Sequence, residues 1–541
     1  SQLGMDDEAY NAFRRAAWSN NVISPASVAA AGIEGKRENW KGMYKLSLDA
    51  IDKESRHPVA IPYAALALYK MGDAKGGAAL CRDLLSKDPL NHLARYALAI
   101  ITGKGRKSFY DVMRSNPAET TLDVCFDLLA AGFVEDSITL LKGVNSVMPD
   151  YAMVHYTLAY CYRLLGRDDL AAKERRAAKR KKIVDVFPSR AGEIKVLRAA
   201  LAADEKDGFA AYLLGCILYD ARLYEDAAEL WERAIKHDPS FYIPYRNLAL
   251  AYYNHLDRPK DALPLMRKAV ELHDNDAMLL CEMATVMQAL GGSYAENAAF
   301  IEAHKPKVVT DQIQLTIARA YSAAGEFDKA EKVMREHIFS PGEGAEVSTA
   351  EPYMYACFAR GRIAMREGRY EDALKDFRAS QTMPENLNVG FWNDSVMMPY
   401  RYYEAEALKC LGREEEAAEL IAKLCSMKDV GMWNMGGEFV YYSAMAVRLG
   451  GEEMRAQRIM RDAILKWEKE LEGGCTYHKV ISGIYNCFVG NGRINRLAKL
   501  YGMLGYGKLY NKDIEGAKEL FRRSIELVPT PKIAFELALL S

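Results

Sequence analysis

The chain has 541 residues, of which 50% are apolar and 27% charged, and its formal net charge is −1. This composition excludes a disordered chain, and the charge balance gives no reason to expect a polyanionic partner. The apolar runs are far shorter than the roughly 18 residues that span a bilayer. We therefore expect a globular or repeat protein that does not enter a membrane.

The ten cysteines stand singly, mostly at apolar positions, and no C-x-x-C pair occurs. We interpret them as buried small hydrophobic side chains rather than as disulfide or zinc ligands. The start of the chain has no signal-peptide pattern. Free cysteines indicate a reducing compartment, so a cytoplasmic location is predicted.

Small residues recur along the chain at the same position of successive helical hairpins. Ala9, Met43 and Gly77 are 34 residues apart and open the second helix of each hairpin. The helix predicted over residues 6–19 has no first helix before it, so the chain is expected to be a fragment of a longer protein. An abbreviated hairpin follows at residues 93–117.

The spacing then widens between Ala171 and Ala227. This insertion holds a basic run over residues 174–182, which we interpret as a solvated helix end because aromatic residues are not interleaved with it. Nucleic-acid binding is therefore not predicted.

The clearest hairpin covers residues 209–242. Two apolar faces with small residues at the closest approach indicate two antiparallel helices; the residues are Leu214, Gly215, Leu218, Ala227, Trp231 and Pro239. Similar hairpins place Gly361 and Phe377, and Gly505 and Phe521, in the same register. Glycines at Gly325, Gly368, Gly412 and Gly451 are predicted to end first helices with a positive φ.

This pattern resembles the tetratricopeptide repeat, although Arg222 stands where the glycine between the helices is usual. The resemblance implies an all-α, right-handed superhelix of about 13 hairpins. We divide it into an N-terminal array at 1–185, a central array at 186–424 and divergent hairpins at 425–541. Apolar faces at residues 1–18 and 533–541 are predicted to be open ends that favour weak self-association.

Two connections, at residues 337–352 and 382–399, are longer than usual and follow the second helices of consecutive hairpins. We expect them to be neighbours on one edge of the array and to form a binding surface, because they combine aromatic, amide and carboxylate groups. The candidate residues are Phe339, Pro341, Glu343, Glu385, Asn386, Asn388, Phe391, Trp392 and Asp394. The alternative is that Phe391 and Trp392 only hold the loop on the array.

Several segments, among them VFPSR at 186–190, HIFSPGEG at 337–344 and MPENLNVG at 383–390, resemble the C-terminal repeat region of large bacterial proteins. Those proteins carry an N-terminal β-rich domain similar to mutarotase-type sugar-binding sandwiches. The resemblance implies that such a domain precedes this chain and is a partner of it. It implies no reaction.

No phosphate-binding loop, metal motif or nucleophile elbow is found, so no catalytic residue, metal or cofactor is predicted. Two functions remain. In the first, the chain is a non-enzymatic scaffold whose concave face binds a protein, a peptide or the missing domain, through Tyr245, Asn247, Arg319, Arg360 and Arg401. In the second, the repeats form one wall of a carbohydrate-binding or carbohydrate-active protein.

Overall fold

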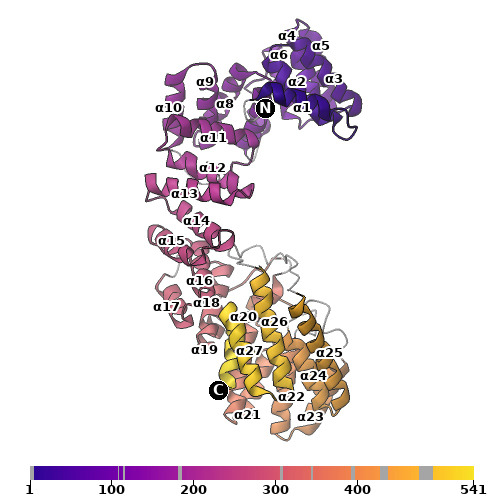
Figure 1. Cartoon of the computed structure of the whole chain (residues 1–541), viewed down its shortest axis with the longest axis vertical. Coiled ribbons are helices and arrows are strands. Elements are labelled where there is room, and N and C mark those ends of the chain that lie inside the picture. Colours follow the sequence, from indigo (N-terminus) through magenta and orange to yellow (C-terminus); the bar gives the residue numbers. More distant parts are fainter. Residues whose placement is uncertain are drawn as a thin grey trace. The chain divides into compact units, whose positions relative to one another are not determined.

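The computed structural model describes residues 5–107, 109–113, 116–180, 186–304, 309–342, 345–390, 397–426, 437–473 and 492–541. These residues form α-helices and two short 3₁₀ turns, and they include no β-strand (Figure 1). The predicted all-α repeat fold is confirmed. Contacts divide the chain into two compact units, unit 1 (Ser1–Pro239) and unit 2 (Ser240–Ser541). The division into three arrays stays a prediction.

Unit 1 contains five hairpins of consecutive helices in its described residues, α2–α3, α4–α5, α7–α8, α9–α10 and α12–α13. Helix α6 is followed by the turn η1 in place of a second helix, which confirms the abbreviated hairpin. Helix α11 occupies part of the predicted insertion. The elements are α1 (Asp6–Ala16), α2 (Ile23–Lys36), α3 (Trp40–Lys53), α4 (Ala60–Lys70), α5 (Ala74–Lys87), α6 (His92–Thr102), η1 (Tyr110–Val112), α7 (Pro117–Ala130), α8 (Val134–Val147), α9 (Ala152–Leu164), α10 (Asp168–Ala178), α11 (Ala191–Ala203), α12 (Gly208–Asp220) and α13 (Tyr224–His237).

Unit 2 contains seven such hairpins among its described residues, from α14–α15 to α26–α27, and then the single helix α28. Its elements are α14 (Tyr242–Asn254), α15 (Pro259–Leu272), α16 (Ala277–Ala289), α17 (Tyr294–Ala303), α18 (Asp311–Ala323), α19 (Phe327–Glu336), α20 (Glu346–Arg366), α21 (Tyr370–Ala379), η2 (Glu385–Leu387), α22 (Met398–Cys410), α23 (Glu414–Ser426), α24 (Gly437–Leu449), α25 (Glu453–Glu472), α26 (Gly492–Tyr510), α27 (Ile514–Leu527) and α28 (Pro531–Leu539).

In three hairpins an aromatic side chain of the second helix lies over a glycine of the first, at Gly215, Gly361 and Gly505. A Cβ added at Gly215 meets the indole nitrogen of Trp231 at 2.6 Å, and one added at Gly361 meets Cε1 of Phe377 at 2.7 Å. The glycines therefore allow the two helices to approach each other closely. Trp231 is 1% exposed. The predicted register of these hairpins is confirmed.

The turns inside the hairpins use left-handed backbone conformations. The φ angles of Gly325, Gly368, Gly412 and Gly451 are all positive, between 72° and 87°, as predicted. Arg222 adopts a φ of 64° at the same place between α12 and α13. A residue with a Cβ therefore occupies a conformation that favours glycine.

The first long connection is shorter than predicted, because α20 begins at Glu346 and not after Pro352. Proline has no N–H and leaves the carbonyl four residues before it without a helical partner. That carbonyl belongs to Ser348, and the guanidinium of Arg319 donates to it at 2.9 Å. A group on another helix thus allows Pro352 to lie inside α20.

The two long connections contact each other. The backbone N–H of Phe339 donates to the carbonyl of Asn386 at 2.8 Å, and the side-chain amide of Asn388 donates to the carbonyl of Phe339 at 2.7 Å. The amide of Asn386 also donates to the carbonyls of Met334 at 2.8 Å and His337 at 2.6 Å. The expectation that the two connections are neighbours is confirmed for their described residues.

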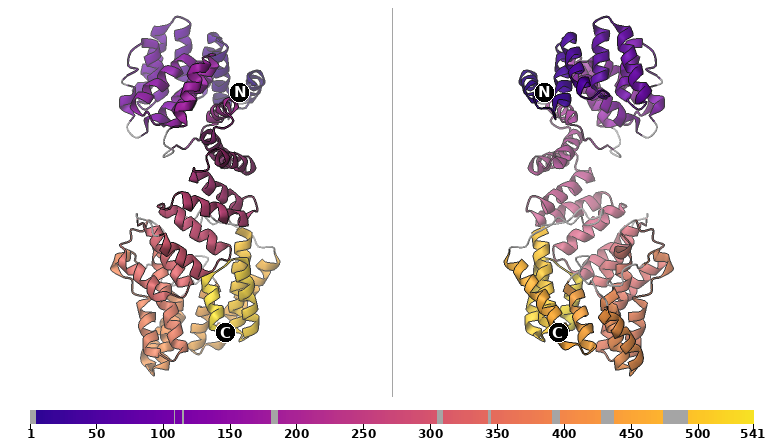
Figure 2. Two further views of the ribbon diagram at one scale, coloured as in Figure 1. Left: turned by 90° about the vertical axis from the view of Figure 1, so that its left-hand side faces the viewer. Right: turned by 90° about the vertical axis from the view of Figure 1, so that its right-hand side faces the viewer.

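The C-terminal helix α28 is not an open end, which corrects the expectation for residues 533–541. Ile533 and Glu536 are 8% and 6% exposed, because α28 packs on α27 and on α18. Figure 2 shows the last helices of unit 2 (yellow) across from its α20 to α22 region (salmon and orange), with the C-terminus between them. Unit 2 therefore brings together helices that are far apart in the sequence.

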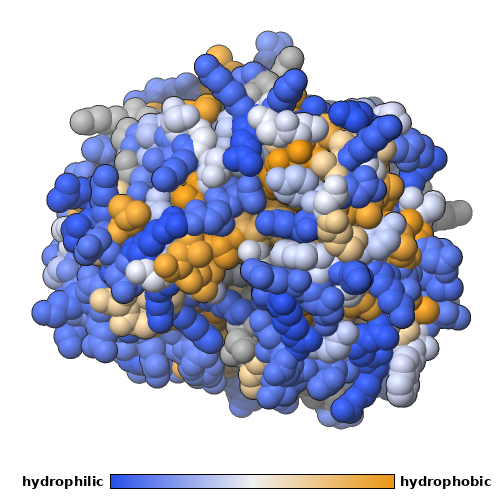
Figure 3. Space-filling model, turned by 90° about the horizontal axis from the view of Figure 1, so that it is seen from above, coloured by the Kyte–Doolittle hydropathy of each residue, from blue (hydrophilic) through white to orange (hydrophobic). Residues whose placement is uncertain are grey.

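The surface is mainly hydrophilic in the view of Figure 3, with apolar groups in several separate clusters. Single large apolar side chains are exposed, among them Trp18 at 87% and Phe187 at 75%. Scattered apolar residues of this kind are normal on protein surfaces. They do not by themselves mark a binding site.

Candidate functional site

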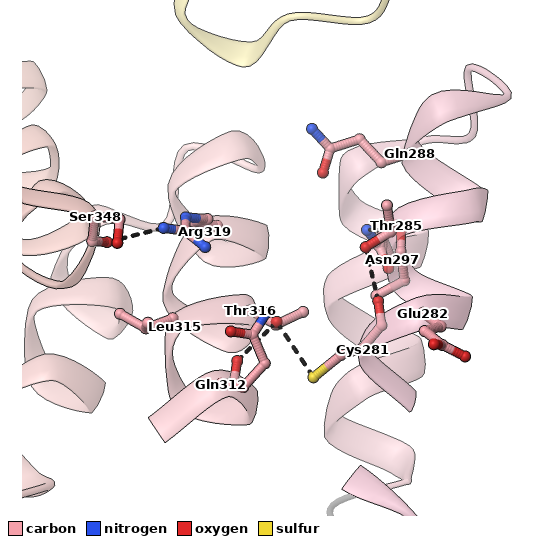
Figure 4. A pocket seen from close by; sticks show the side chains of 11 residues that line it. Cys281, Glu282, Thr285, Gln288, Asn297, Gln312, Leu315, Thr316, Arg319 and Ser348 are labelled. Atoms are coloured by element: carbon pink, nitrogen blue, oxygen red, sulfur yellow. Dashed lines mark hydrogen bonds between the residues drawn. The ribbon is translucent and has the colours of Figure 1, made fainter. Parts of the chain in front are cut away.

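The candidate site lies in unit 2, on the face formed by the first helices α16, α18 and α20, which contact one another in sequence. A cavity of about 320 Å³ opens between α16 and α18 (Figure 4). We call it the polar pocket. Its lining residues are Cys281, Glu282, Ala284, Thr285, Gln288, Asn297, Gln312, Leu315, Thr316, Arg319 and Ser348.

Six of the eleven residues that line the polar pocket carry a side-chain hydroxyl or amide. In Figure 4, Gln312 and Thr316 of α18 face Cys281 of α16 across the space, and Gln288 extends from α16 toward it. The Thr316 hydroxyl donates to the carbonyl of Gln312 at 2.8 Å, and its oxygen lies 3.4 Å from the Cys281 sulfur. The walls thus offer both hydrogen-bond donors and acceptors.

Asn297 carries an unpartnered acceptor at the pocket. Its side-chain nitrogen donates to the carbonyl of Ala284 at 3.1 Å, and this fixes the orientation of the amide. Its oxygen Oδ1 has no hydrogen-bond partner in the protein, although the residue is only 3% exposed. Leaving a buried polar atom unpaired costs about 1–3 kcal/mol, so the wall of the pocket at Asn297 is locally unfavourable.

A second cavity adjoins the polar pocket and shares Gln288 and Arg319 with it. It measures about 250 Å³ and is closed on one side by Thr530, Pro531 and Lys532, at the start of α28; its other lining residues are Ser322, Ala323, Glu351, Pro352 and Tyr355. The hydroxyl of Ser322 is buried without a protein partner. The two cavities form one groove along α16, α18 and α20, which we call the polar groove after its first cavity.

Arg319 is held in place at the centre of this groove. Besides its bond to the Ser348 carbonyl, its Nε lies 3.7 Å from a carboxylate oxygen of Glu351. Burial acts to raise the pKa of Glu351, but Lys532 and Arg319 together hold that pKa below its ordinary value. The groove therefore contains a fixed guanidinium beside an ionised carboxylate.

The groove has no reactive thiol. Burial raises the pKa of the Cys281 thiol to about 11, so the thiol is protonated at neutral pH and is a weak nucleophile. In the described residues no group of three His, Cys, Asp or Glu side chains has the geometry of a metal site. Within the same residues, no helix has the length and apolar character that a membrane span requires.

Of the residues predicted on the concave face, Arg319 lies in the groove and the others do not line it. Tyr245 is 8% exposed in α14. The amide oxygen of Asn247 accepts from Arg246 at 3.1 Å. Arg360 pairs with Asp376 at 2.7 Å, and also with Asp328 and Glu331 of α19. Arg401 lies in α22.

Those loop residues predicted to bind that the structure describes do not line the groove. Phe339 is fully buried in a core cluster with Met334, Tyr353 and Leu387. Pro341 is partly buried, and Glu385 and Asn388 are exposed. Asn386 and Asn388 hold the two connections together through the bonds given above. Glu343, Phe391, Trp392 and Asp394 lie outside the described residues, so binding at these loops stays a prediction.

Apart from Arg319, the sequence analysis missed the polar residues of the groove. Gln312, Thr316 and Arg319 follow one another at i, i+4 and i+7, which places them on one face of α18. A polar stripe on the first helix of a repeat is the signal that could have found them. Asn297 could not be found in this way, since it belongs to the second helix α17.

Unit 1 has a cavity of its own, of about 660 Å³, between α2, α7, α9 and α11. Lys36 forms an ion pair with Asp6 at 3.2 Å at one side of it. Burial, and to a smaller extent Asp123, raises the pKa of Asp127, another lining residue, to about 6. This carboxyl group therefore titrates closer to neutral pH than an ordinary aspartate.

Comparison with known proteins agrees with this repeat architecture. A family model described as a tetratricopeptide repeat matches residues 212–277, which run from within α12 to the end of α15 and the first residue of α16. Residues 212–277 are therefore similar to tetratricopeptide repeats. These repeats generally mediate contacts between proteins.

Solved structures with similar repeats include PilF of Pseudomonas aeruginosa, at 19% identity over 43% of this chain and 92% of that one, with a TM-score of 0.25. Human IFIT1, solved as a dimer with PPP-AAAA, is similar at 16% identity over 78% and 93%, with a TM-score of 0.27. The C-terminal part of a repeat protein of Cytophaga hutchinsonii is similar at 13% identity over 49% and 98%, with a TM-score of 0.28.

Proposed function

We propose that the chain is a non-enzymatic scaffold and that the polar groove of unit 2 binds an extended segment of a protein partner. The observation that carries the proposal is a cavity lined by the amides and hydroxyls of Gln288, Gln312 and Thr316 beside Arg319. A peptide backbone presents an N–H donor and a C=O acceptor at every residue. It can therefore pair with the donors and acceptors that α16 and α18 present to the groove together.

Arg319 gives the groove a preference for a negatively charged segment. Its guanidinium is oriented by Ser348 and Glu351 at the junction of the two cavities. A fixed guanidinium binds carboxylates well because little conformational freedom is lost. The preferred segment is expected to carry an acidic group near its contact with Arg319.

Selection from random linear peptides displayed on phage tests this proposal with the full chain. Peptides selected on the wild type are synthesised, and their affinities are measured by calorimetry for the wild type, Thr316→Val and Gln288→Ala. Each variant removes polar groups from the groove, so each is expected to weaken binding by about tenfold or more, since a lost buried hydrogen bond costs 1–3 kcal/mol.

Gln457→Ala is the matched control, because this glutamine bonds to Glu453 on the exposed side of α25 at 2.9 Å. It should leave the affinities unchanged. Equal affinity of all selected peptides for Thr316→Val and the wild type would contradict the proposal. A panel of oligosaccharides is measured in parallel. Binding of a sugar that depends on Thr316, without peptide binding, would favour the carbohydrate function.

A further inference from the structure

Helix α28 is bound on the inner side of unit 2 by helices more than a hundred residues earlier in the chain. It contacts α27, which precedes it, and also α18. Its side chains reach α20 as well, where Arg366 donates to the carbonyl of Ala538 at 3.4 Å. We call the surface that α28 covers on α18 to α20 the docking face.

Two ion pairs of opposite polarity fix α28 on the docking face. Lys532 lies 2.9 Å from Glu351 of α20. Glu536, one helical turn later, pairs with Arg362 of the same helix. The side chains of Arg362 and Glu536 are only 9% and 8% exposed. Because the polarity reverses along the helix, the contact sets the direction in which a helix can lie there.

An aromatic side chain stands between the two charges. The ring of Phe535 lies edge-on to Phe327 and Tyr355, with ring centres 5.9 and 6.2 Å away. The guanidinium carbon of Arg362 is 5.7 Å from the centre of the Phe535 ring. The docking face thus presents an aromatic slot beside a cation, a combination that favours an aromatic residue over an aliphatic one.

The docking face and the polar groove are continuous. Thr530, Pro531 and Lys532 form one wall of the cavity that contains Gln288 and Arg319. Glu351 is shared, since it lies near Arg319 of the groove and near Lys532 of α28. Departure of α28 would remove that wall and one of the two cations beside Glu351. A helix that leaves the docking face therefore widens the groove.

We infer that the docking face is a helix-binding surface for a protein partner, and that α28 is its resident occupant. This inference rests on the proposed function of the groove. The partner presents a helix with a basic residue at position i, an aromatic residue at i+3 and an acidic residue at i+4, which is the pattern of Lys532, Phe535 and Glu536. The acid is essential because Arg362 is nearly buried, and an unpaired buried charge is strongly unfavourable. A helix without it cannot replace α28.

The test uses a fluorescently labelled peptide of residues 530–541 and the full chain. Its affinity is measured by anisotropy for the wild type and for the triple variant Lys532→Ala/Phe535→Ala/Glu536→Ala, which loses the three anchors of α28 but keeps the docking face. The peptide should bind the triple variant about tenfold or more tightly than the wild type, since the competing cis helix is weakened. Circular dichroism checks that the variant keeps its helix content.

The matched controls change one partner at a time. A peptide with alanine in place of Glu536 should bind the triple variant about tenfold or more weakly than the unchanged peptide does. Adding Arg362→Met to the triple variant should weaken its binding of the unchanged peptide by a similar factor. The single variant Glu536→Ala serves if the triple variant loses helix content. Equal affinity for wild type and variant, or binding that does not depend on Arg362, would overturn the inference. Thr316→Val should leave the binding of the 530–541 peptide unchanged. The proposed function of the polar groove and the inference about the docking face can therefore fail independently of each other.

Discussion

Arg222 stands in the turn between α12 and α13 with a φ of 64°, where the turns at Gly325, Gly368, Gly412 and Gly451 use glycine. The side chain of Arg222 is exposed. A left-handed conformation costs a residue with a Cβ roughly 1–2 kcal/mol, and glycine avoids this cost but loses more entropy on folding. Glycine at residue 222 would therefore relieve backbone strain in this turn.

We expect Arg222→Gly to raise the free energy of unfolding by about 0.5–1 kcal/mol, the difference between these two effects. Gly368→Val should have the opposite sign, because it places a β-branched residue at a φ of 75°. Denaturation in urea measures both. A stabilising Gly368→Val would contradict the role given to the positive φ.

Asp127 gives unit 1 a pH dependence. Its folded-state pKa is about 6, above the ordinary value of 3.8, because burial disfavours the charged form. Between these two values the folded state binds more protons than the unfolded state, so stability falls as pH rises through this window. Below pH 3.8 the stabilising contribution of protonated Asp127 is fully present, and above pH 6 it is lost.

We therefore expect Asp127→Asn to be more stable than the wild type at pH 7.5, by about 1–2 kcal/mol, and equal to it near pH 4. The estimate is lower than the full shift implies, since the side chain keeps some contact with solvent. Melting temperatures at the two pH values measure the difference. An equal gain at both values would show that the effect does not come from titration.

Among the elements, α20 depends on a group outside itself. Pro352 leaves the carbonyl of Ser348 without a helical donor, and Arg319 of α18 supplies one at 2.9 Å. This bond also joins the first helices of two successive repeats. The same guanidinium thus completes α20 and orients the polar groove.

A double-mutant cycle tests this dependence. Arg319→Met should cost about 1–2 kcal/mol in the wild type but about 1 kcal/mol less in Pro352→Ala, where the new N–H of residue 352 reaches Ser348. Unfolding in guanidinium chloride measures the four chains. Arg413→Met, which removes an exposed pair with Glu416, should show no coupling with Pro352→Ala. Equal costs of Arg319→Met in both backgrounds would assign Arg319 another role.

At the scale of the whole molecule, the repeat pattern could be predicted because each hairpin is formed by residues that are close together in the sequence. Gly361 and Phe377 lie in one hairpin, and their close contact follows from spacing alone. The start of α20 was misplaced because the donor to Ser348 comes from a different hairpin. The position of α28 was missed for the same reason, since Arg362 and Glu536 are 174 residues apart.

The site was predicted only in part, and again the reason is distance along the chain. Arg319 was found because it lies on a first helix. Asn297, on a second helix, reaches the same pocket only through the packing of α17 on α16 and α18. The loop residues Phe339 and Asn386 looked like binding groups by composition. In the structure their side chains pack in the core or bond to backbone carbonyls, which composition cannot reveal.

Each unit closes on itself by a contact between distant helices. In unit 1, α2 approaches the end of α7 so closely that a Cβ added at Gly35 meets the carbonyl oxygen of Ala131 at 2.6 Å. In unit 2, α28 lies on α18. Contacts of this kind make a run of repeats cooperative beyond its nearest-neighbour interfaces.

We therefore predict that the two units unfold as separate cooperative bodies. Gly35→Val should force α2 away from α7 and lower amide protection throughout unit 1, while Gly361→Val, which collides with Phe377, should do so throughout unit 2. Hydrogen exchange read by mass spectrometry assigns the loss to each unit, since sub-global opening exposes contiguous segments. Loss of protection in both units from either variant would mean that the chain unfolds as one body.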